Sequence, residues 1–314
     1  MAVCALAPTY TLLLFARIIT GIFGGVIGSI SMAIVADLFS LQQRGRVMSF
    51  LQMGFGVSQI LGIPIGLFIA NRWGWNIPFL WIAVMAGIIT VTLFLKLKQI
   101  TKHLELWQDQ SVFKHLWQTV SLKNYRIGFL STALLSIGGF MMMPFASNFA
   151  INNLKITITQ LPLLFMITGI GALVSMPLIG RLSDNNNKLK IFTIATLSAI
   201  ITINIYAHYA VTPFWIVLVT NVVMMISIMS RMVPATALTS AIPQPQDRGA
   251  FMSINSSLQQ MAGGFGAMLA GLVILQKDNF APSQHYGTLA MMTSAIMLLT
   301  IYLVYRVSKI VEAK

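Results

Sequence analysis

The side chains that could do chemistry in this chain are two arginines and three amides that lie inside long apolar segments. Arg17 and Arg231 should each face a cavity or a partner, because an arginine inside a membrane costs about 2.5 to 3.5 kcal/mol. Among the amides, Asn255 and Gln259 are four residues apart and therefore share one helix face. Such amides either recognise a solute or join helices by hydrogen bonds. We therefore take Asn221, Arg231, Asn255 and Gln259 as candidates for a substrate path.

Bond-making chemistry is not indicated by the rest of the sequence. None of the seven acidic residues stands in the middle of an apolar segment, the four histidines fall in loops, and Cys4 is alone. The sequence therefore predicts no metal site, no disulfide and no cofactor. It has no GxxxxGK[ST] loop, which argues against an ATP-driven pump. A polytopic membrane enzyme should cluster acids, histidines or a nucleophile at one membrane face, and it stays the least favoured alternative.

The composition predicts an all-α, polytopic membrane protein. Hydrophobic residues make up 57% of the chain and charged residues only 9%, whereas soluble domains carry about 25% charged residues. A spanning helix needs about 20 mostly apolar residues, and such segments recur along the chain. We expect about nine full spans, which begin near Thr11, Val47, Ile77, Ile127, Leu161, Ile191, Phe214, Ala250 and Gly287.

The net charge of +13 is distributed by topology and not as a nucleic-acid footprint. Fifteen basic residues fall in alternate loops and the C-terminal tail, and only Arg72, Lys155 and Lys277 fall in the opposite set. By the positive-inside rule the rich set and the C-terminus lie in the cytoplasm. We expect no nucleic-acid partner; the partner of most of the surface is the lipid bilayer.

An internal repeat divides the chain. Residues 44–49, with the sequence RGRVMS, return as RGAFMS at residues 248–253, 204 positions later, and internal repeats are typical of secondary transporters. A polar stretch, residues 96–124, reads as a cytoplasmic linker with an amphipathic helix on the membrane surface. It separates residues 1–95, with three full spans, from residues 125–314, with six. If the halves began equal, three spans are missing at the front.

Four stretches carry a family resemblance: Arg17–Gly25, Gly62–Gly66, Gly180–Lys190, and Ser230–Ala235 leading to Arg248–Gln260. They resemble signatures of the fourth span, the fifth span, the loop after the eighth span, and the tenth and eleventh spans of the major facilitator superfamily. Within it they are similar to the bacterial sugar and drug efflux branch of drug:proton antiporters, of the purine-nucleoside and arabinose exporter type. Against that family the chain lacks the first two spans and most of the third.

The resemblance implies a monomeric exporter in the bacterial inner membrane that moves a small organic solute (sugar, nucleoside or drug-like) by alternating access, coupled to protons. It assigns proton coupling to Arg17. It assigns conformational roles to the motif residues Gly21, Gly25, Gly62, Pro64, Gly66, Gly180, Asp184, Lys188, Arg44 and Arg248. Because spans are missing, a non-transporting truncated remnant is the main alternative.

Methionines form a further candidate feature. The chain has 20 of them, including Met141–Met143, Met224, Met225 and Met229. Methionine side chains are flexible and polarisable, so they suit an adaptable pocket for hydrophobic cargo, although they also serve as ordinary packing or lipid-facing residues. Both interpretations stay open at the level of sequence.

Overall fold

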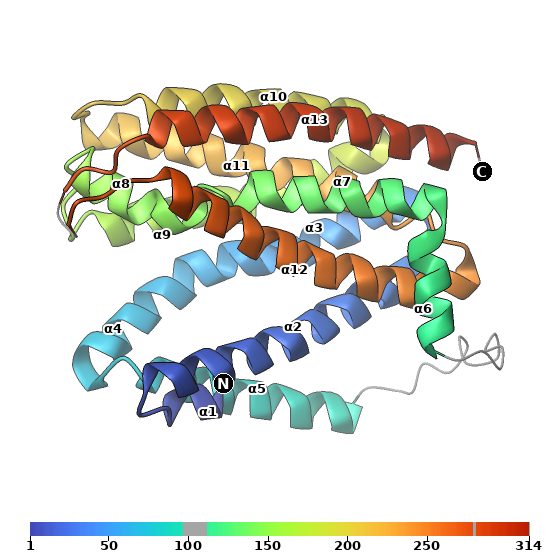
Figure 1. Cartoon of the computed structure of the whole chain (residues 1–314), viewed down its shortest axis with the longest axis horizontal. Coiled ribbons are helices and arrows are strands. Elements are labelled where there is room, and N and C mark those ends of the chain that lie inside the picture. The colour runs from blue at the N-terminus through green and yellow to red at the C-terminus, as the bar shows by residue number, and fades with distance from the viewer. Residues whose placement is uncertain (97–111, 279–280, 314) are drawn as a thin grey trace.

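The protein is all helical apart from one isolated bridge between Leu275 and Gln284 in the computed structural model, which describes residues 1–96, 112–278 and 281–313. Its longer helices, drawn in Figure 1, are α2 (Tyr10–Leu38), α3 (Leu41–Val57), α4 (Ile63–Trp73), α5 (Ile77–Lys96), α6 (Val112–Ser121), α7 (Lys123–Phe140), α9 (Leu161–Asn185), α10 (Lys188–Ala207), α11 (Phe214–Thr239), α12 (Arg248–Val273) and α13 (Tyr286–Glu312). Two short helices are α1 (Ala2–Ala5) and α8 (Ala146–Asn152). The predicted all-α, polytopic fold is confirmed.

Seven helical segments of the described residues are long and apolar enough to cross a membrane, against nine expected spans. They are Tyr10–Gly28, Ile77–Lys96, Lys123–Asn152, Leu161–Asn185, Lys188–Ala207, Phe214–Thr239 and Tyr286–Glu312. The two other expected spans are helical as well. One is divided into α3 and α4 by the π-helical turn Ser58–Gly62. The other, α12, carries the polar side chains of Asn255, Ser256, Gln259 and Gln260.

Several helices begin a few residues before the predicted span. Lys123, Lys188 and Arg248 are the first residues of α7, α10 and α12, where the apolar segments predicted starts at 127, 191 and 250. The reason is that each helix extends beyond its apolar segment into water, where its charged end residues are solvated. At α10 the Asn187 side chain also caps the helix, since its Oδ1 accepts hydrogen bonds from the Leu189 and Lys190 amides at 2.9 and 3.2 Å.

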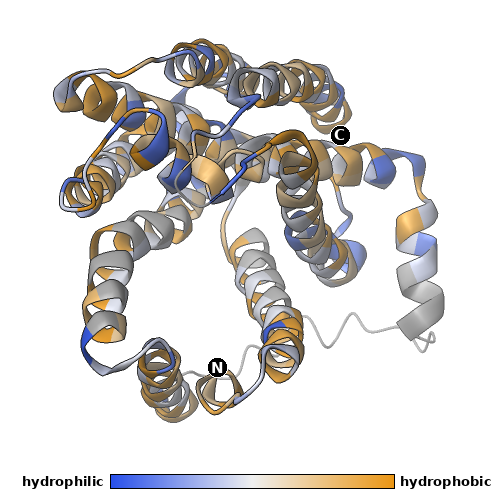
Figure 2. Cartoon of the chain, turned by 60° about the vertical axis from the view of Figure 1, so that its left-hand side comes forward, coloured by the Kyte–Doolittle hydropathy of each residue, from blue (hydrophilic) through white to orange (hydrophobic). Residues whose placement is uncertain are grey.

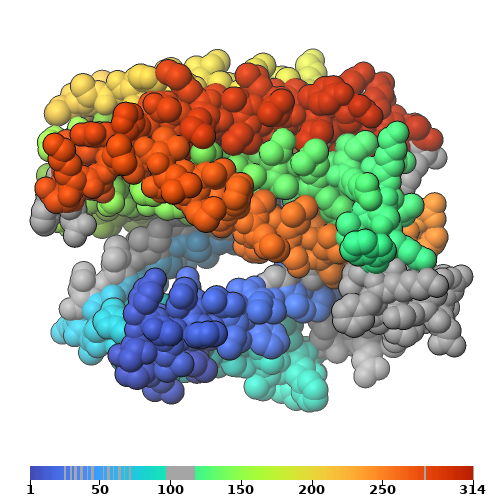
Figure 3. Space-filling model, in the orientation of Figure 1, coloured from blue at the N-terminus to red at the C-terminus, as the bar shows by residue number. Residues whose placement is uncertain are grey.

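The helices form two groups, α1–α5 and α7–α13, which meet near the end of the molecule that carries the C-terminus (Figure 1). Helix α3 packs along α9, and α2 packs against α12. Towards the opposite end, α2 and α4 diverge from the second group (Figure 1), and Figure 3 shows a gap between the two groups on this face. The molecule is therefore closed at one end and open at the other.

The buried core lies in the second group. The two large apolar clusters draw all their buried members from residues 125–307, whereas α5 has no buried residue. Many large apolar side chains are exposed, among them Phe15, Trp81 and Val174, and Figure 2 shows apolar residues along most of the helices. An exposed apolar surface of this kind is stable in lipid, whose tails satisfy it as well as a protein core would.

The expected span that begins near Val47 changes direction within its length (Figure 1). The π turn Ser58–Gly62 ends directly before α4, whose first turn contains Pro64. Proline lacks the N–H that would continue an α-helical ladder, so a helix bends or widens before it.

Of the expected linker, Val112–Ser121 forms α6, whose Trp117 is 76% exposed. Residues 97–111, with Glu105 and Asp109, lie outside the described residues.

Candidate functional site

The main candidate site is a cavity of about 380 Å³ within the second helix group. Pockets that bind small molecules measure about 300 to 1,000 Å³. Its walls come from α7, α8, α9 and α11, with single residues of α10 and α13: Gly139, Phe140, Met142, Met143, Ala146, Ser147, Leu161, Pro162, Phe165, Ile203, Asn221, Met224, Met225, Ile228, Met229, Met232 and Tyr286. Its volume therefore suits a small organic solute.

Helix α11 supplies the largest share of the wall. Its cavity residues recur at spacings of three and four, from Asn221 through Ile228 to Met232, which places them on one helix face. Six of the lining residues are methionines, and five of these were singled out in the sequence; Met141 is instead fully buried in the core. The cavity is therefore apolar and built from adaptable side chains.

Asn221 is one of the few polar groups in this wall. Its side chain is 6% exposed, and its Oδ1 accepts a hydrogen bond of 2.9 Å from the Thr168 hydroxyl of α9. This contact fixes the orientation of the amide and leaves the NH₂ as the group able to donate. Tyr286 closes another side of the cavity, its ring stacked on Phe149 with centroids 3.8 Å apart.

Asn255 and Gln259 lie in a different, smaller pocket. This pocket measures about 20 Å³ and is lined by Thr132, Leu135, Ala235, Thr236, Thr239, Ser240, Met252, Asn255, Ser256 and Gln259. A water molecule needs about 10 to 15 Å³ of such space, so there is room for one water-sized group. The Asn255 Oδ1 is buried there and has no hydrogen-bond partner in the part of the chain that the structure describes. The structure thus separates Asn255 and Gln259 from Asn221.

Arg231 lines neither pocket. Its side chain is fully buried in α11, and none of its three guanidinium nitrogens has a hydrogen-bond partner. Its guanidinium carbon lies 5.9 Å from the centre of the Phe192 ring on α10, a distance at which a cation is attracted to the ring face. Arg231 is therefore a buried cation without an anionic contact among the described residues.

Arg17 lies in the first helix group. Its side chain is exposed on α2, and its guanidinium carbon is 5.7 Å from the centre of the Phe79 ring on α5. Arg17 does not line either pocket. The structure thus places the arginine that the family assigns to proton coupling on a different helix group from the methionine-rich cavity.

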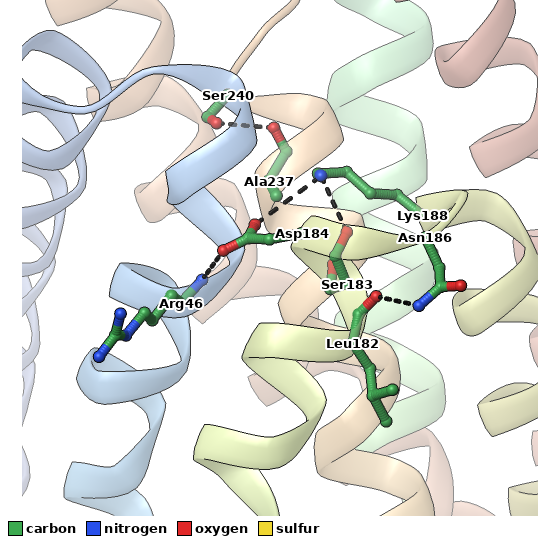
Figure 4. Close-up of polar contacts among 8 residues, drawn as sticks. All are labelled: Arg46, Leu182, Ser183, Asp184, Asn186, Lys188, Ala237 and Ser240. Carbon is green, nitrogen blue, oxygen red and sulfur yellow. Dashed lines mark hydrogen bonds and ion pairs between the residues drawn. The ribbon is translucent and has the colours of Figure 1, made fainter.

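The motif Gly180–Lys190 was expected in a loop, but its first residues form the last turns of α9 and Lys188 begins α10. It forms a contact between the two helix groups (Figure 4). The Arg46 amide, in the second turn of α3, donates a hydrogen bond of 2.9 Å to Asp184 Oδ2. Lys188 lies 3.8 Å from the other carboxylate oxygen and donates to the Ser183 carbonyl at 2.9 Å. A Cβ on Gly180 would collide with the Ser49 side chain and lie 3.1 Å from the Arg46 Cα. Glycine at 180 therefore lets α9 approach the backbone of α3.

Three other glycines of the motifs, Gly21, Gly62 and Gly66, make no such approach to a described residue. A Cβ added to Gly21 or Gly66 would meet no atom within 4 Å, and one added to Gly62 would meet only Ser58, at 3.7 Å. Arg248 is the first residue of α12. Gly25 and Pro64 lie within α2 and α4. Their side-chain surroundings, and those of Arg44 in α3, lie outside the described residues.

Sequence reasoning missed several cavity residues. Thr168, which orients Asn221, and Tyr286 and Ser147, which line the wall, carry no sequence signal, because a lone hydroxyl in an apolar segment is ordinary. Met232 was also missed, although it continues the helix face of Met225 and Met229. Counting this face along the whole of α11 would have found it.

The sequence of this chain matches known proteins of one family. The sequence profile of the Major Facilitator Superfamily matches residues 1–267 and 128–312. The uncharacterized MFS-type transporter YbcL of Bacillus subtilis (strain 168) is 28% identical over 298 residues, covering 94% of this chain and 74% of that protein. Multidrug resistance protein 3 of the same organism is 35% identical over 78 residues, covering 25% of this chain and 15% of that protein.

Two solved structures share the fold. The human organic anion transporter MFSD10 superposes with a TM-score of 0.71 at 16% identity, covering 96% of this chain and 73% of that one. The E. coli fucose:proton symporter FucP superposes with a TM-score of 0.67 at 12% identity, covering 97% of this chain and 78% of that one. At these identities the likeness concerns the fold alone.

Proposed function

Since the chain belongs to the Major Facilitator Superfamily and is a multi-pass membrane transporter, we propose that it exports a small organic solute by alternating access. The observation that carries the proposal is the cavity of about 380 Å³ in a molecule whose two helix groups meet at one end and diverge at the other. Alternating access requires two helix groups that rock against each other around the bound solute. The division into residues 1–95 and 125–314, joined by the linker 96–124, is part of this proposal.

The lining of the cavity favours a drug-like solute over a sugar. A sugar needs many hydrogen-bonding groups, because each buried hydroxyl without a partner is costly. The wall offers Asn221, Ser147 and Tyr286 as polar side chains beside six methionines. We therefore place the chain with the drug:proton antiporters of the efflux branch, with export in exchange for protons.

Proton coupling is proposed for Arg17. The Arg17 guanidinium is exposed and lies over the Phe79 ring, so it is able to interact with a charge that comes near it. None of the described carboxylates lies in the middle of a span, where it could couple protons instead. The test is efflux of a fluorescent apolar solute from proteoliposomes under an imposed pH gradient. Arg17→Ala should abolish gradient-driven efflux, while Arg306→Ala, an exposed arginine at the end of α13, should keep it. Unchanged efflux in Arg17→Ala would remove the coupling role.

The same assay distinguishes an exporter from a truncated remnant that does not transport. A remnant would bind solute in the cavity but would move none across the bilayer, with or without a gradient.

Placement in the bacterial inner membrane with the C-terminus in the cytoplasm is supported by the 15 to 3 distribution of basic residues. A C-terminal reporter that is active only in the cytoplasm tests it, and light scattering of the purified protein tests the expected monomer.

A further inference from the structure

Arg231 carries a charge that no described side chain neutralises. An arginine stays protonated in proteins, and this one is fully buried, with no hydrogen bond from any guanidinium nitrogen to a described residue. The carboxylates of Asp184, Asp247 and Glu312 are engaged elsewhere, with Arg46, Tyr125 and Lys309 respectively. Buried charges are normally paired, so this residue needs an explanation.

The guanidinium lies beside Gly138 of α7, the residue that precedes the cavity-lining Gly139. A Cβ on Gly138 of α7 would be 3.7 Å from Arg231 Nη1, and a Cβ on the next residue, Gly139, would be 3.9 Å from the Met232 Cε. Gly139 and Met232 both line the cavity. Gly138 and Arg231 are thus each next in sequence to a cavity-lining residue, Gly139 on α7 and Met232 on α11.

The field of this cation reaches the cavity with little screening. The guanidinium has apolar neighbours in Phe192 and Gly138, and no lining side chain of the cavity is charged. Charges separated by apolar protein interact far more strongly than charges in water. We propose that Arg231 makes the methionine-rich cavity select solutes that carry an anionic group beside their apolar body. This inference rests on the proposed function only in taking the cavity as the cargo site.

The test uses three solutes with the same ring: 2-naphthoate, 2-naphthamide and 2-naphthylmethylammonium. Dissociation constants are measured by calorimetry on the purified protein in detergent. We expect the anion to bind at least tenfold more tightly than the cation, a difference of about 1.4 kcal/mol, with the amide between them. Arg231→Met should abolish this order, Arg231→Lys should keep it in weaker form, and Arg306→Gln should leave it unchanged.

A second measurement does not depend on how well the variants fold. The preference of the wild-type protein should persist when potassium gluconate is raised from 0.05 to 0.5 M, because salt screens surface charges and scarcely affects buried ones. A preference that vanishes with salt, equal binding of all three solutes, no binding of any, or the same order in a folded Arg231→Met would each overturn the proposal. Selective binding without transport would keep it and refute the proposed function.

Discussion

Substitution of Gly180 by alanine tests the contact between the two helix groups most directly. The added Cβ would collide with the Ser49 side chain and come within 3.1 Å of the Arg46 Cα. The serine could turn away, but the Arg46 contact is with backbone, so it is relieved only if α3 and α9 separate. Overpacking of this kind costs about 1 to 3 kcal/mol. We therefore expect the equilibrium to shift by about 5- to 150-fold towards separation of α3 and α9.

The shift is measured as a distance. Spin labels at Gln43 and Asn186, both exposed, report the separation of α3 and α9 by pulsed electron paramagnetic resonance, in a chain whose buried Cys4 is replaced by alanine. Gly180→Ala should move most of the distance distribution to longer values. The close contact with the Ser49 side chain predicts partial recovery when Ser49→Gly is added.

Gly54→Ala is the matched control on α3, since a Cβ there would meet no atom within 4 Å. Alanine is also the better helix former, by about 1 kcal/mol, so this variant should keep the original distances and a melting temperature no lower than that of the parent. An unaltered distribution in Gly180→Ala, or the same displacement in Gly54→Ala, would refute the packing argument.

Three further predictions concern single side chains. Tyr125→Phe should lower the free energy of unfolding by about 1 to 3 kcal/mol, seen in thermal denaturation, because its hydroxyl donates to Asp247 at 2.7 Å and accepts from the Gln244 amide at 3.0 Å; an unchanged melting temperature would contradict it. Asp184→Asn should slow transport and loosen the spin-label distance between α3 and α9, since the Arg46 amide loses a charged acceptor; a transport rate equal to that of the parent would count against it. Asn255→Leu should leave thermal stability unchanged or higher, because it removes a buried carbonyl oxygen without a partner, and a lower melting temperature would show that the oxygen is satisfied.

The fold was predictable because lipid imposes it. Long apolar segments must be helical to satisfy their backbone groups, so starts such as Ile77, Leu161 and Phe214 coincide with the observed helices. The cavity was only partly predictable. The methionines indicated it, but which of them line it depends on how α11 is rotated against α7 and α9, and this is set by packing between distant segments. For the same reason, the sequence could not show that Arg231 has no hydrogen-bond partner among the described residues. It shows that a charge lies in a helix, but not what surrounds that charge.

The π turn at Ser58–Gly62 has a consequence for helical phase. A π turn holds one more residue than an α turn, and each residue turns the helix by about 100°. Every side chain of α4 is therefore rotated by about that angle from where an unbroken α-helix starting at Leu41 would point it. Deleting one residue within the turn would restore the regular phase and turn a different side of α4 towards its neighbours, so a one-residue deletion here would alter this helix more than most substitutions in it.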